Sequence, residues 1–317
     1  MVDRGGCVKV AISARNYVFD GCKAVELLKN NGFEVVDLSN KNFKSGAEYF
    51  EAIKDAEALI NAFEPMSAEL LKKCNKLRVI SVRGVGYDYI DASACKELGI
   101  AITRTVGTVG EAVSEQVIAY IMHFAREVNK LNSFMQMGDW NRIMTEGAYG
   151  KTIGIIGFGE IGSAVAKKAD ALGMKVIYNC KNEKNLPYDF VDIKTLLKMS
   201  DYVVLALPLT DETNNLIDEK AFSLMKKNAV LINVARAGIV DTLALKNAVE
   251  KGIIKGAAVD VFENEPCINS PLRNTENIIL TPHTAPFTRK NFIDMNTLAA
   301  ENIIHFFDET IDKKYLV

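Results

Sequence analysis

The stretch from Thr152 to Lys181 constrains the fold of this chain more than any other part of the sequence. It begins with a short apolar, β-branched run, 152–156, which is typical of a buried strand. Three glycines then follow in the pattern Gly-x-Gly-x-x-Gly, and apolar side chains recur behind them at helical spacing. A second apolar run at 174–178 has the character of another strand. Strand, glycine turn, helix and strand in this order predict a nucleotide-binding βαβ unit.

Each glycine of this motif has its own physical role. Gly157 permits a tight turn, Gly159 lets the backbone approach a pyrophosphate, and Gly162 lets the helix pack closely on the strand. The first helical turn, which contains Glu160 and Ile161, directs its amides and the positive end of the helix dipole toward the phosphates. The motif therefore predicts a dinucleotide cofactor, NAD or NADP.

Length, charge and cysteine spacing exclude several other classes of protein. A chain of 317 residues with 49% hydrophobic and 25% charged residues suits a globular protein of about two domains. The net charge of −2 argues against nucleic acid or a membrane surface as the main partner. No apolar stretch is long enough to span a bilayer, and residues 1–7 lack the pattern of a signal peptide. The six cysteines have no metal-type spacing, so we expect reduced thiols, no bound metal and a cytoplasmic protein.

Strand and helix patterns alternate on both sides of the glycine motif. Apolar runs typical of strands occur at 9–13, 34–38, 58–62, 77–83 and 100–104 before the motif, and at 202–207, 229–235, 257–262 and 278–281 after it. Helical patterns lie between them, and two longer helices are expected at 111–130 and 289–307. Such alternation predicts parallel sheets covered on both faces. We therefore expect an α/β fold with two doubly wound parallel-sheet lobes.

Three charged residues come directly after apolar runs in the second half of the chain: Arg236, Glu265 and His283. Ligands bind at the carboxyl ends of the strands in open α/β sheets. An arginine can bind a carboxylate through two hydrogen bonds. A carboxylate beside an imidazole fixes its tautomer and makes it a proton donor near neutral pH. These three residues predict an active site, whereas His123 and His305 lie in helical patterns and are interpreted as structural.

Several stretches, taken in order, resemble the D-isomer-specific 2-hydroxyacid dehydrogenase family, which includes D-lactate, glycerate and 3-phosphoglycerate dehydrogenases. The matching stretches span 83–91, 111–115, 150–162, 207–210, 232–241, 258–266 and 280–285, so the resemblance covers essentially the whole chain. It implies a Rossmann nucleotide domain at 106–285, inserted into a flavodoxin-like substrate domain made of 1–105 and 286–317. It also implies a homodimer formed through the helix at 111–130 and its neighbours.

The resemblance implies a role for each residue of the site. Arg236 and the backbone amides of Val85 and Gly86 would hold the carboxylate of a 2-oxo acid, and His283, supported by Glu265, would donate a proton to its carbonyl oxygen. Asp260 would bind the carboxamide of the nicotinamide, which delivers the hydride. The whole cofactor-binding set consists of Gly157, Gly159, Glu160, Ile161, Gly162, Cys180, Lys181, Leu207, Pro208, Val234, Ala235 and Asp260. The implied reaction is the reduction of a small, pyruvate-like 2-oxo acid to the D-2-hydroxy acid.

The residue at the end of the second strand of the βαβ unit bears on the choice of cofactor. NAD-preferring members carry an aspartate there to bind the ribose hydroxyls, but this chain has Cys180 followed by Lys181. The absence of this carboxylate removes one source of repulsion toward a 2′-phosphate. Lys181 would attract the phosphate, although Glu183 would oppose this. We therefore expect NADPH to be favoured over NADH.

The substrate and the class of activity leave alternatives. The residues after His283, Thr-Ala-Pro-Phe-Thr, resemble those of D-lactate dehydrogenases, which favours that branch. Arg83 lies near the place where phosphoglycerate enzymes carry an extra arginine, so it is a substrate-binding candidate, and 3-phosphoglycerate or glycerate/hydroxypyruvate dehydrogenase is the alternative. A different class, an NAD(H)-responsive corepressor or binding protein, would keep much of this trio but show no turnover of 2-oxo acids.

Overall fold

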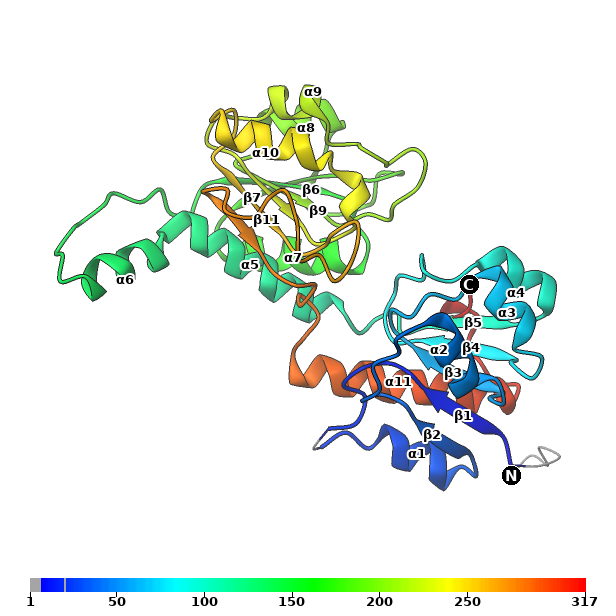
Figure 1. Ribbon diagram of the computed structural model, residues 1–317. Helices are drawn as coiled ribbons and strands as arrows, with labels where there is room; N and C mark the ends of the chain where they lie inside the picture. The colour runs from blue at the N-terminus through cyan, green and yellow to red at the C-terminus, as the bar shows by residue number, and fades with distance from the viewer. Residues whose placement is uncertain (1–6, 20) are drawn as a thin grey trace. The chain divides into compact units, whose positions relative to one another are not determined.

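The computed structural model describes residues 7–19 and 21–317. The first residues, where the sequence lacks a signal-peptide pattern, lie almost entirely outside the described part. The chain divides into two compact units, and Figure 1 labels most of the helices and strands of both. Unit 1 combines the chain up to Val109 with Thr288–Val317, and unit 2 comprises Gly110–Phe287.

Unit 1 contains a five-stranded sheet with the strand order β2-β1-β3-β4-β5, in which every neighbouring pair is parallel. Its strands are β1 (Lys9–Ile12), β2 (Glu34–Asp37), β3 (Ala58–Asn61), β4 (Val79–Val82) and β5 (Ala101–Arg104). Its helices are α1 (Ala24–Asn30), α2 (Gly46–Ile53), α3 (Ala68–Lys73), α4 (Ala92–Leu98) and α11 (Arg289–Phe307), with a final 3₁₀ turn η2 (Lys313–Tyr315). This order is that of a flavodoxin-like doubly wound sheet.

Alternate residues of the buried strands of unit 1 enter two different apolar clusters. In β1, Val10 and Ile12 belong to the cluster that includes α1 and α11, whereas Ala11 belongs to the cluster that includes α2, α3 and α4. Since side chains alternate across a strand, the two clusters lie on opposite faces of the sheet. A hydrogen bond also holds α11 on the sheet of unit 1, because the Ser81 hydroxyl in β4 donates to the Ala299 carbonyl in α11 at 2.9 Å. The expected covering of both faces is confirmed.

Unit 2 contains a seven-stranded sheet with the order β12-β11-β10-β9-β6-β7-β8, again parallel throughout. Its strands are β6 (Thr152–Ile156), β7 (Lys175–Asn179), β8 (Asp189–Phe190), β9 (Tyr202–Leu205), β10 (Val230–Asn233), β11 (Gly256–Val259) and β12 (Ile278–Leu280). Its helices are α5 (Gly110–Arg126), α6 (Val128–Gln136), α7 (Glu160–Ala171), α8 (Ile193–Met199), α9 (Glu219–Leu224) and α10 (Thr242–Glu250), with a 3₁₀ turn η1 (Ala237–Ile239). The direction of winding reverses at β6, which lies between β7 and β9.

The single helix expected at 111–130 is wrong, because α5 ends at Arg126 and α6 begins at Val128. Glu127 between them has a φ of 47°, which is outside the right-handed helical region. Lys255, which precedes β11, donates to the Phe124 carbonyl at 3.1 Å and pairs with the Glu127 carboxylate at 3.3 Å. A lysine distant in the sequence thus satisfies a carbonyl of the last helical turn, as cations near helix C-termini do.

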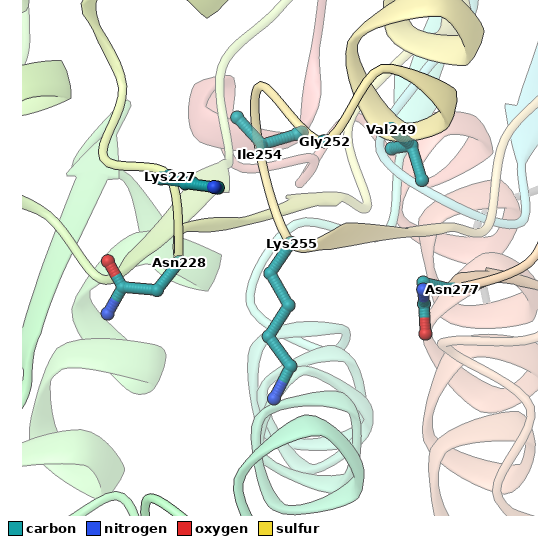
Figure 2. Close-up of a pocket in the computed structure, with 7 residues that line it drawn as sticks. All are labelled: Lys227, Asn228, Val249, Gly252, Ile254, Lys255 and Asn277. Atoms are coloured by element: carbon teal, nitrogen blue, oxygen red, sulfur yellow. The ribbon is translucent and has the colours of Figure 1, made fainter.

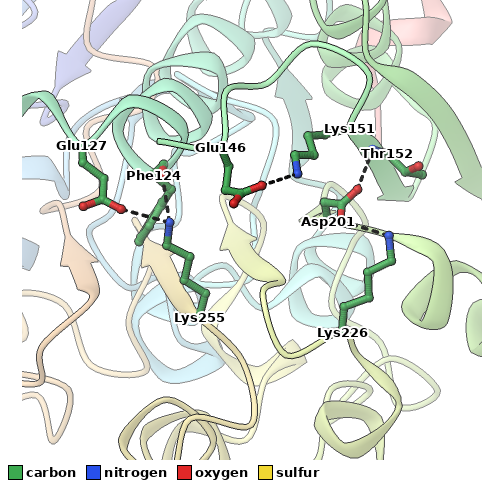
Figure 3. A network of polar contacts seen from close by, with 8 residues as sticks. All are labelled: Phe124, Glu127, Glu146, Lys151, Thr152, Asp201, Lys226 and Lys255. Carbon is green, nitrogen blue, oxygen red and sulfur yellow. Dashed lines mark hydrogen bonds and ion pairs between the residues drawn. The ribbon is translucent and has the colours of Figure 1, made fainter. Parts of the chain in front are cut away.

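The amino-terminal edge of the seven-stranded sheet carries a network of polar contacts, drawn in Figure 3. Asp201 accepts hydrogen bonds from the Thr152 amide at 2.9 Å and from the Lys226 ammonium at 3.0 Å. Glu146 pairs with Lys151 at 2.7 Å. These contacts lie at the edge opposite the glycine motif and link the segments that lead into β6, β9 and β10. Among the described residues, no helix is long and apolar enough to cross a bilayer.

Candidate active site

The glycine motif forms a tight cradle at the carboxyl end of β6. Gly157 has a φ of 93°, and a Cβ atom there would lie 2.3 Å from the Ala206 carbonyl oxygen, just beyond β9. A Cβ on Gly162 would lie 2.2 Å from the Gly157 carbonyl oxygen, so helix and turn need glycine to pack this closely. At Gly159, which precedes α7 without a side-chain cap, a Cβ would meet no atom within 4 Å. The residues present therefore fit a dinucleotide whose phosphates face the first turn of α7.

The other expected cofactor contacts surround this cradle. Leu207 lies beside the turn, since its Cβ is 2.8 Å from the position that a Cβ on Gly157 would take. Val234 and Ala235 follow β10, and the Ala235 amide is held by the Asn233 side chain at 3.0 Å. Glu160 turns its carboxylate to the start of α5, where it accepts from the Gly110 amide at 2.7 Å. Of the residues after β7, Cys180 is half-buried and Lys181 is exposed.

The three charged residues come together at the same edge of the sheet. His283 Nδ1 lies 2.6 Å from Glu265 Oε2, and the other carboxylate oxygen of Glu265 accepts from the Phe262 amide at 2.9 Å. Arg236 follows β10, and its guanidinium donates to the Ala235 carbonyl at 2.8 Å. The His283 and Glu265 side chains are 25% and 29% exposed, so water or a small ligand can reach them.

The electrostatics of the Glu265 carboxylate reflect its neighbours. Burial alone would raise the pKa of Glu265, but the hydrogen bond and charge of His283, the Phe262 amide and the charge of Arg236 outweigh it and hold that pKa below its ordinary value. An ionised carboxylate can accept a hydrogen bond from Nδ1–H, so the contact with Glu265 favours the tautomer of His283 with a proton on Nδ1.

A chain of hydrogen bonds that the sequence did not indicate supports the segment carrying His283. The Tyr120 hydroxyl lies 2.5 Å from the Thr281 hydroxyl, which donates to Asp260 Oδ1 at 2.5 Å. The Asp260 carboxylate also accepts from the amides of Thr284 and Ala285, both at 2.9 Å. Asp260 is only 1% exposed, and this burial raises its pKa in spite of the hydrogen bonds.

These hydrogen bonds fix the backbone on either side of His283. The φ of His283, 52°, is unusual for a residue with a side chain. Such a backbone conformation persists only where the surrounding structure holds it. Asp260 bonds to Thr281, two residues before the histidine, and to Thr284, directly after it. No sequence pattern singled out Tyr120, because it lies on the helix face that contributes to the core.

Arg83, Val85 and Gly86 lie in unit 1, at the carboxyl end of β4. Arg83 is 6% exposed, donates to the Arg15 carbonyl at 2.5 Å and packs 4.7 Å from the ring centre of Phe292. Burial lowers the pKa of Arg83 to about 10, so the guanidinium stays charged near neutral pH. Val85 and Gly86 are partly exposed.

Two hollows in unit 2 lie apart from the glycine cradle. One, of about 460 Å³, is lined by Lys227, Asn228, Val249, Gly252, Ile254, Lys255 and Asn277, as Figure 2 shows. Its residues precede β10, β11 and β12, so it belongs to the amino-terminal edge of the sheet and not to the edge that carries the glycine motif. The other, of about 530 Å³, lies beside the segment that carries Glu265 and includes Asp241, Phe262 and Cys267. Within the described ranges, no cluster of His, Cys, Asp and Glu has the arrangement of a metal site.

Comparisons with known proteins agree with this geometry. Residues 118–285 match the family described as D-isomer specific 2-hydroxyacid dehydrogenase, NAD binding domain. A glyoxylate reductase of Thermococcus litoralis is 38% identical over 271 residues, covering 81% of this chain and 82% of that protein. A D-lactate dehydrogenase from Aquifex aeolicus, solved with NAD and lactic acid, has a TM-score of 0.85 at 28% identity and covers 98% of both chains. An acyclic imino acid reductase (Bsp5), solved with NADPH and D-Arg, has a TM-score of 0.88 at 26% identity, covering 98% of this chain and 100% of that one.

These matches confirm the family that the sequence resembles but do not single out the D-lactate branch, since the 38% identical relative is a glyoxylate reductase. They confirm NAD(P) as the cofactor class. With a nucleotide-domain match over more than half of the chain, and a relative that aligns over four-fifths of it, the chain belongs to the D-isomer-specific 2-hydroxyacid dehydrogenase family of NAD(P)-dependent enzymes, which interconvert 2-oxo and 2-hydroxy acids.

Proposed function

We propose that this protein reduces glyoxylate, or a 2-oxo acid nearly as small, to the corresponding 2-hydroxy acid with NADPH as the preferred reductant. The observation that carries the proposal is the 2.6 Å pair of His283 and Glu265, at the sheet edge that also holds Arg236 and the glycine cradle. The 38% identical glyoxylate reductase supports glyoxylate as the substrate. Pyruvate is the second candidate, supported by the structural similarity to a D-lactate dehydrogenase at 28% identity.

In the proposed mechanism Arg236 binds the substrate carboxylate through its guanidinium fork. Glu265 holds the His283 ring with a proton on Nδ1, so the protonated ring can donate its second proton from Nε2 to the carbonyl oxygen. When bound, the reduced nicotinamide supplies the hydride for the carbonyl carbon. The carbonyl gains one hydride and one proton, and neutral His283 takes up a proton before the next turnover. The reverse reaction uses the same groups in opposite roles.

For two residues the proposed role differs from the one that the family resemblance implies. Asp260 would act chiefly by fixing the segment around His283. Any contact with the carboxamide would use Oδ2, which accepts from the Ala285 amide at 2.9 Å. Arg83 is buried, so we propose that its side chain fixes the position of the 84–86 segment. The amides of Val85 and Gly86 in that segment would bind the substrate carboxylate. Unit 1 would then be the substrate domain and unit 2 the nucleotide domain.

We further propose a homodimer that covers α6 and the segment after it. None of the residues of α6 is buried, and Figure 1 shows α6 extending beyond the sheet of unit 2. Trp140 is 71% exposed and Met144 is 99% exposed. Large apolar side chains gathered on a monomer surface are typical of an interface. Light scattering coupled to gel filtration tests this proposal, since a mass of one chain at micromolar concentration would contradict it.

Turnover tests the function directly. Oxidation of NADPH and of NADH is followed with glyoxylate, hydroxypyruvate, pyruvate and 3-phosphohydroxypyruvate. We expect the highest kcat/KM with glyoxylate, and a His283→Ala control lacking the activity. A higher value for pyruvate would favour the D-lactate reaction, and turnover restricted to the phosphorylated acid would favour the phosphoglycerate reaction. Cofactor binding without turnover of any 2-oxo acid would support the corepressor class and refute the enzymatic proposal.

A further inference from the structure

The segment that follows β7 is folded tightly back onto the end of that strand. The Tyr178 hydroxyl accepts from the Lys184 amide and donates to the Lys184 carbonyl, both at 2.9 Å. Tyr178 is completely buried, so these two bonds fix the backbone of Lys184 to the core. The Cys180 thiol donates to the Asn182 carbonyl at 2.9 Å, which closes the turn between strand and lysine.

Aromatic side chains join this segment to the glycine turn. Phe158, the residue between Gly157 and Gly159, is buried. Its ring centre lies 4.5 Å from that of Tyr178 and 6.1 Å from that of Tyr188. The glycine turn and the 180–188 segment therefore share one apolar cluster, and their backbones are held in a defined relation.

The ammonium of Lys184 lies at the glycine turn itself. Its Nζ donates to the Phe158 carbonyl at 2.5 Å, which uses one of its three N–H donors. The residue is otherwise exposed, and within the described residues no carboxylate forms an ion pair with it. Lys181, which the sequence favoured, is exposed and has no such anchor. Binding a ligand would cost the free Lys181 side chain more rotamer entropy than the anchored Lys184.

We propose that Lys184 is the residue that recognises the 2′-phosphate of NADPH. The inference rests on the proposed binding of the cofactor at the glycine cradle. In such a cradle the pyrophosphate faces the helix start, and the adenosine ribose lies toward the end of the second strand. Lys184 connects these two places, because its backbone is fixed beside β7 and its charge lies on the glycine turn. The strand end carries Cys180 where NAD-preferring members carry an aspartate, so a phosphate monoester meets no carboxylate at that position, and the charge of Lys184 acts against that of the neighbouring Glu183.

Direct binding tests the role of Lys184 without relying on turnover. Dissociation constants for NADPH and NADH are measured by the fluorescence of the bound cofactor, for the natural protein and for Lys184→Gln, Lys184→Arg and Lys181→Gln. We expect Lys184→Gln to weaken NADPH binding by roughly tenfold or more, as loss of a charged hydrogen bond does, with NADH changed by less than about twofold. Lys184→Arg retains the charge and should retain most of the NADPH affinity. Lys181→Gln tests the lysine that the sequence favoured, and it should weaken NADPH binding less than Lys184→Gln does.

Other outcomes would overturn the inference. Equal losses of NADH and NADPH affinity in Lys184→Gln would assign the lysine to the pyrophosphate or to folding, and a larger selective loss in Lys181→Gln would return the role to Lys181. Competition by 2′,5′-ADP and by 5′-ADP distinguishes contacts to the 2′-phosphate from contacts to the rest of the nucleotide. In Lys184→Gln, 2′,5′-ADP should lose affinity and 5′-ADP should not. If the natural protein prefers NADH but Lys184→Gln still loses NADPH selectively, the proposed cofactor preference fails and the role of Lys184 stands. If the natural protein binds neither cofactor, both fail.

Discussion

Replacing Thr281 with Val tests whether the hydrogen-bond chain behind His283 supports the site. The Thr281 hydroxyl lies 2.5 Å from the Tyr120 hydroxyl and 2.5 Å from the Asp260 carboxylate. Valine has nearly the shape of threonine, so the change removes both hydrogen bonds and leaves the volume in place. The Asp260 carboxylate is 1% exposed, and water cannot easily replace the lost donor.

The size of the effect follows from the two bonds that disappear. A hydrogen bond to a charged group contributes about 1.5–3 kcal/mol to stability, and one between neutral groups contributes about 0.5–1.5 kcal/mol. Asp260 keeps the amides of Thr284 and Ala285, which places the expected loss near the lower end of the sum, about 2–3 kcal/mol. Because a small misplacement of a catalytic group can cost up to about a hundredfold in rate, we also expect kcat to fall by roughly tenfold or more.

Urea unfolding and steady-state kinetics measure the two effects. Thr281→Ser is the matched control, because it keeps the hydroxyl and loses only a methyl group, and Tyr120→Phe removes one neutral bond alone. We expect Thr281→Val to be the least stable of the three. A loss below about 0.5 kcal/mol for Thr281→Val would show that the hydroxyl contributes little, since even one neutral bond is worth about that much. Equal losses for Thr281→Val and Thr281→Ser would assign the effect to packing of the methyl group.

Four further changes test the rest of the site and the sheet. His283→Ala should lower kcat by roughly two to four orders of magnitude, as loss of a general acid does, with the NADPH dissociation constant unchanged; an unaffected rate would exclude His283 from the reaction. Cys180→Asp should shift the ratio of NADPH to NADH affinity toward NADH, and an unchanged ratio would mean that the ribose does not lie at the end of β7. Because the pKa of Glu265 is held below its ordinary value, its contribution to stability is present above about pH 4.3 and is lost as the pH falls through the lowered pKa. Glu265→Gln should therefore flatten the acid limb of stability against pH, and an identical limb would refute the assignment. Asp201→Ala leaves two donors at the amino-terminal edge without their acceptor (Figure 3) and should cost about 1–3 kcal/mol in urea unfolding, with kcat unchanged.

The sequence by itself determined the features that depend on local pattern. The glycine turn at 157–162 and the alternation of strands and helices follow from spacing along the chain, because turn geometry and side-chain periodicity are properties of neighbouring residues. The meeting of Arg236 with the pair of His283 and Glu265 was predictable for a related reason. Parallel strands bring their carboxyl ends to one edge of a sheet, so position along a strand is also position in space.

Tertiary structure decided the features that depend on residues distant in the sequence. Lys255 ends α5 by bonding the Phe124 carbonyl, and no pattern within the helix indicates it. The choice of Lys184 over Lys181 follows from a fold in the backbone that brings its ammonium to the Phe158 carbonyl. Asp260 is likewise buried only in the folded chain. Its link through Thr281 to Tyr120 joins three segments that are distant in the sequence. Burial and hydrogen bonding depend on contacts between segments, so a linear pattern can name candidate reacting groups but not the side chains that hold them in place.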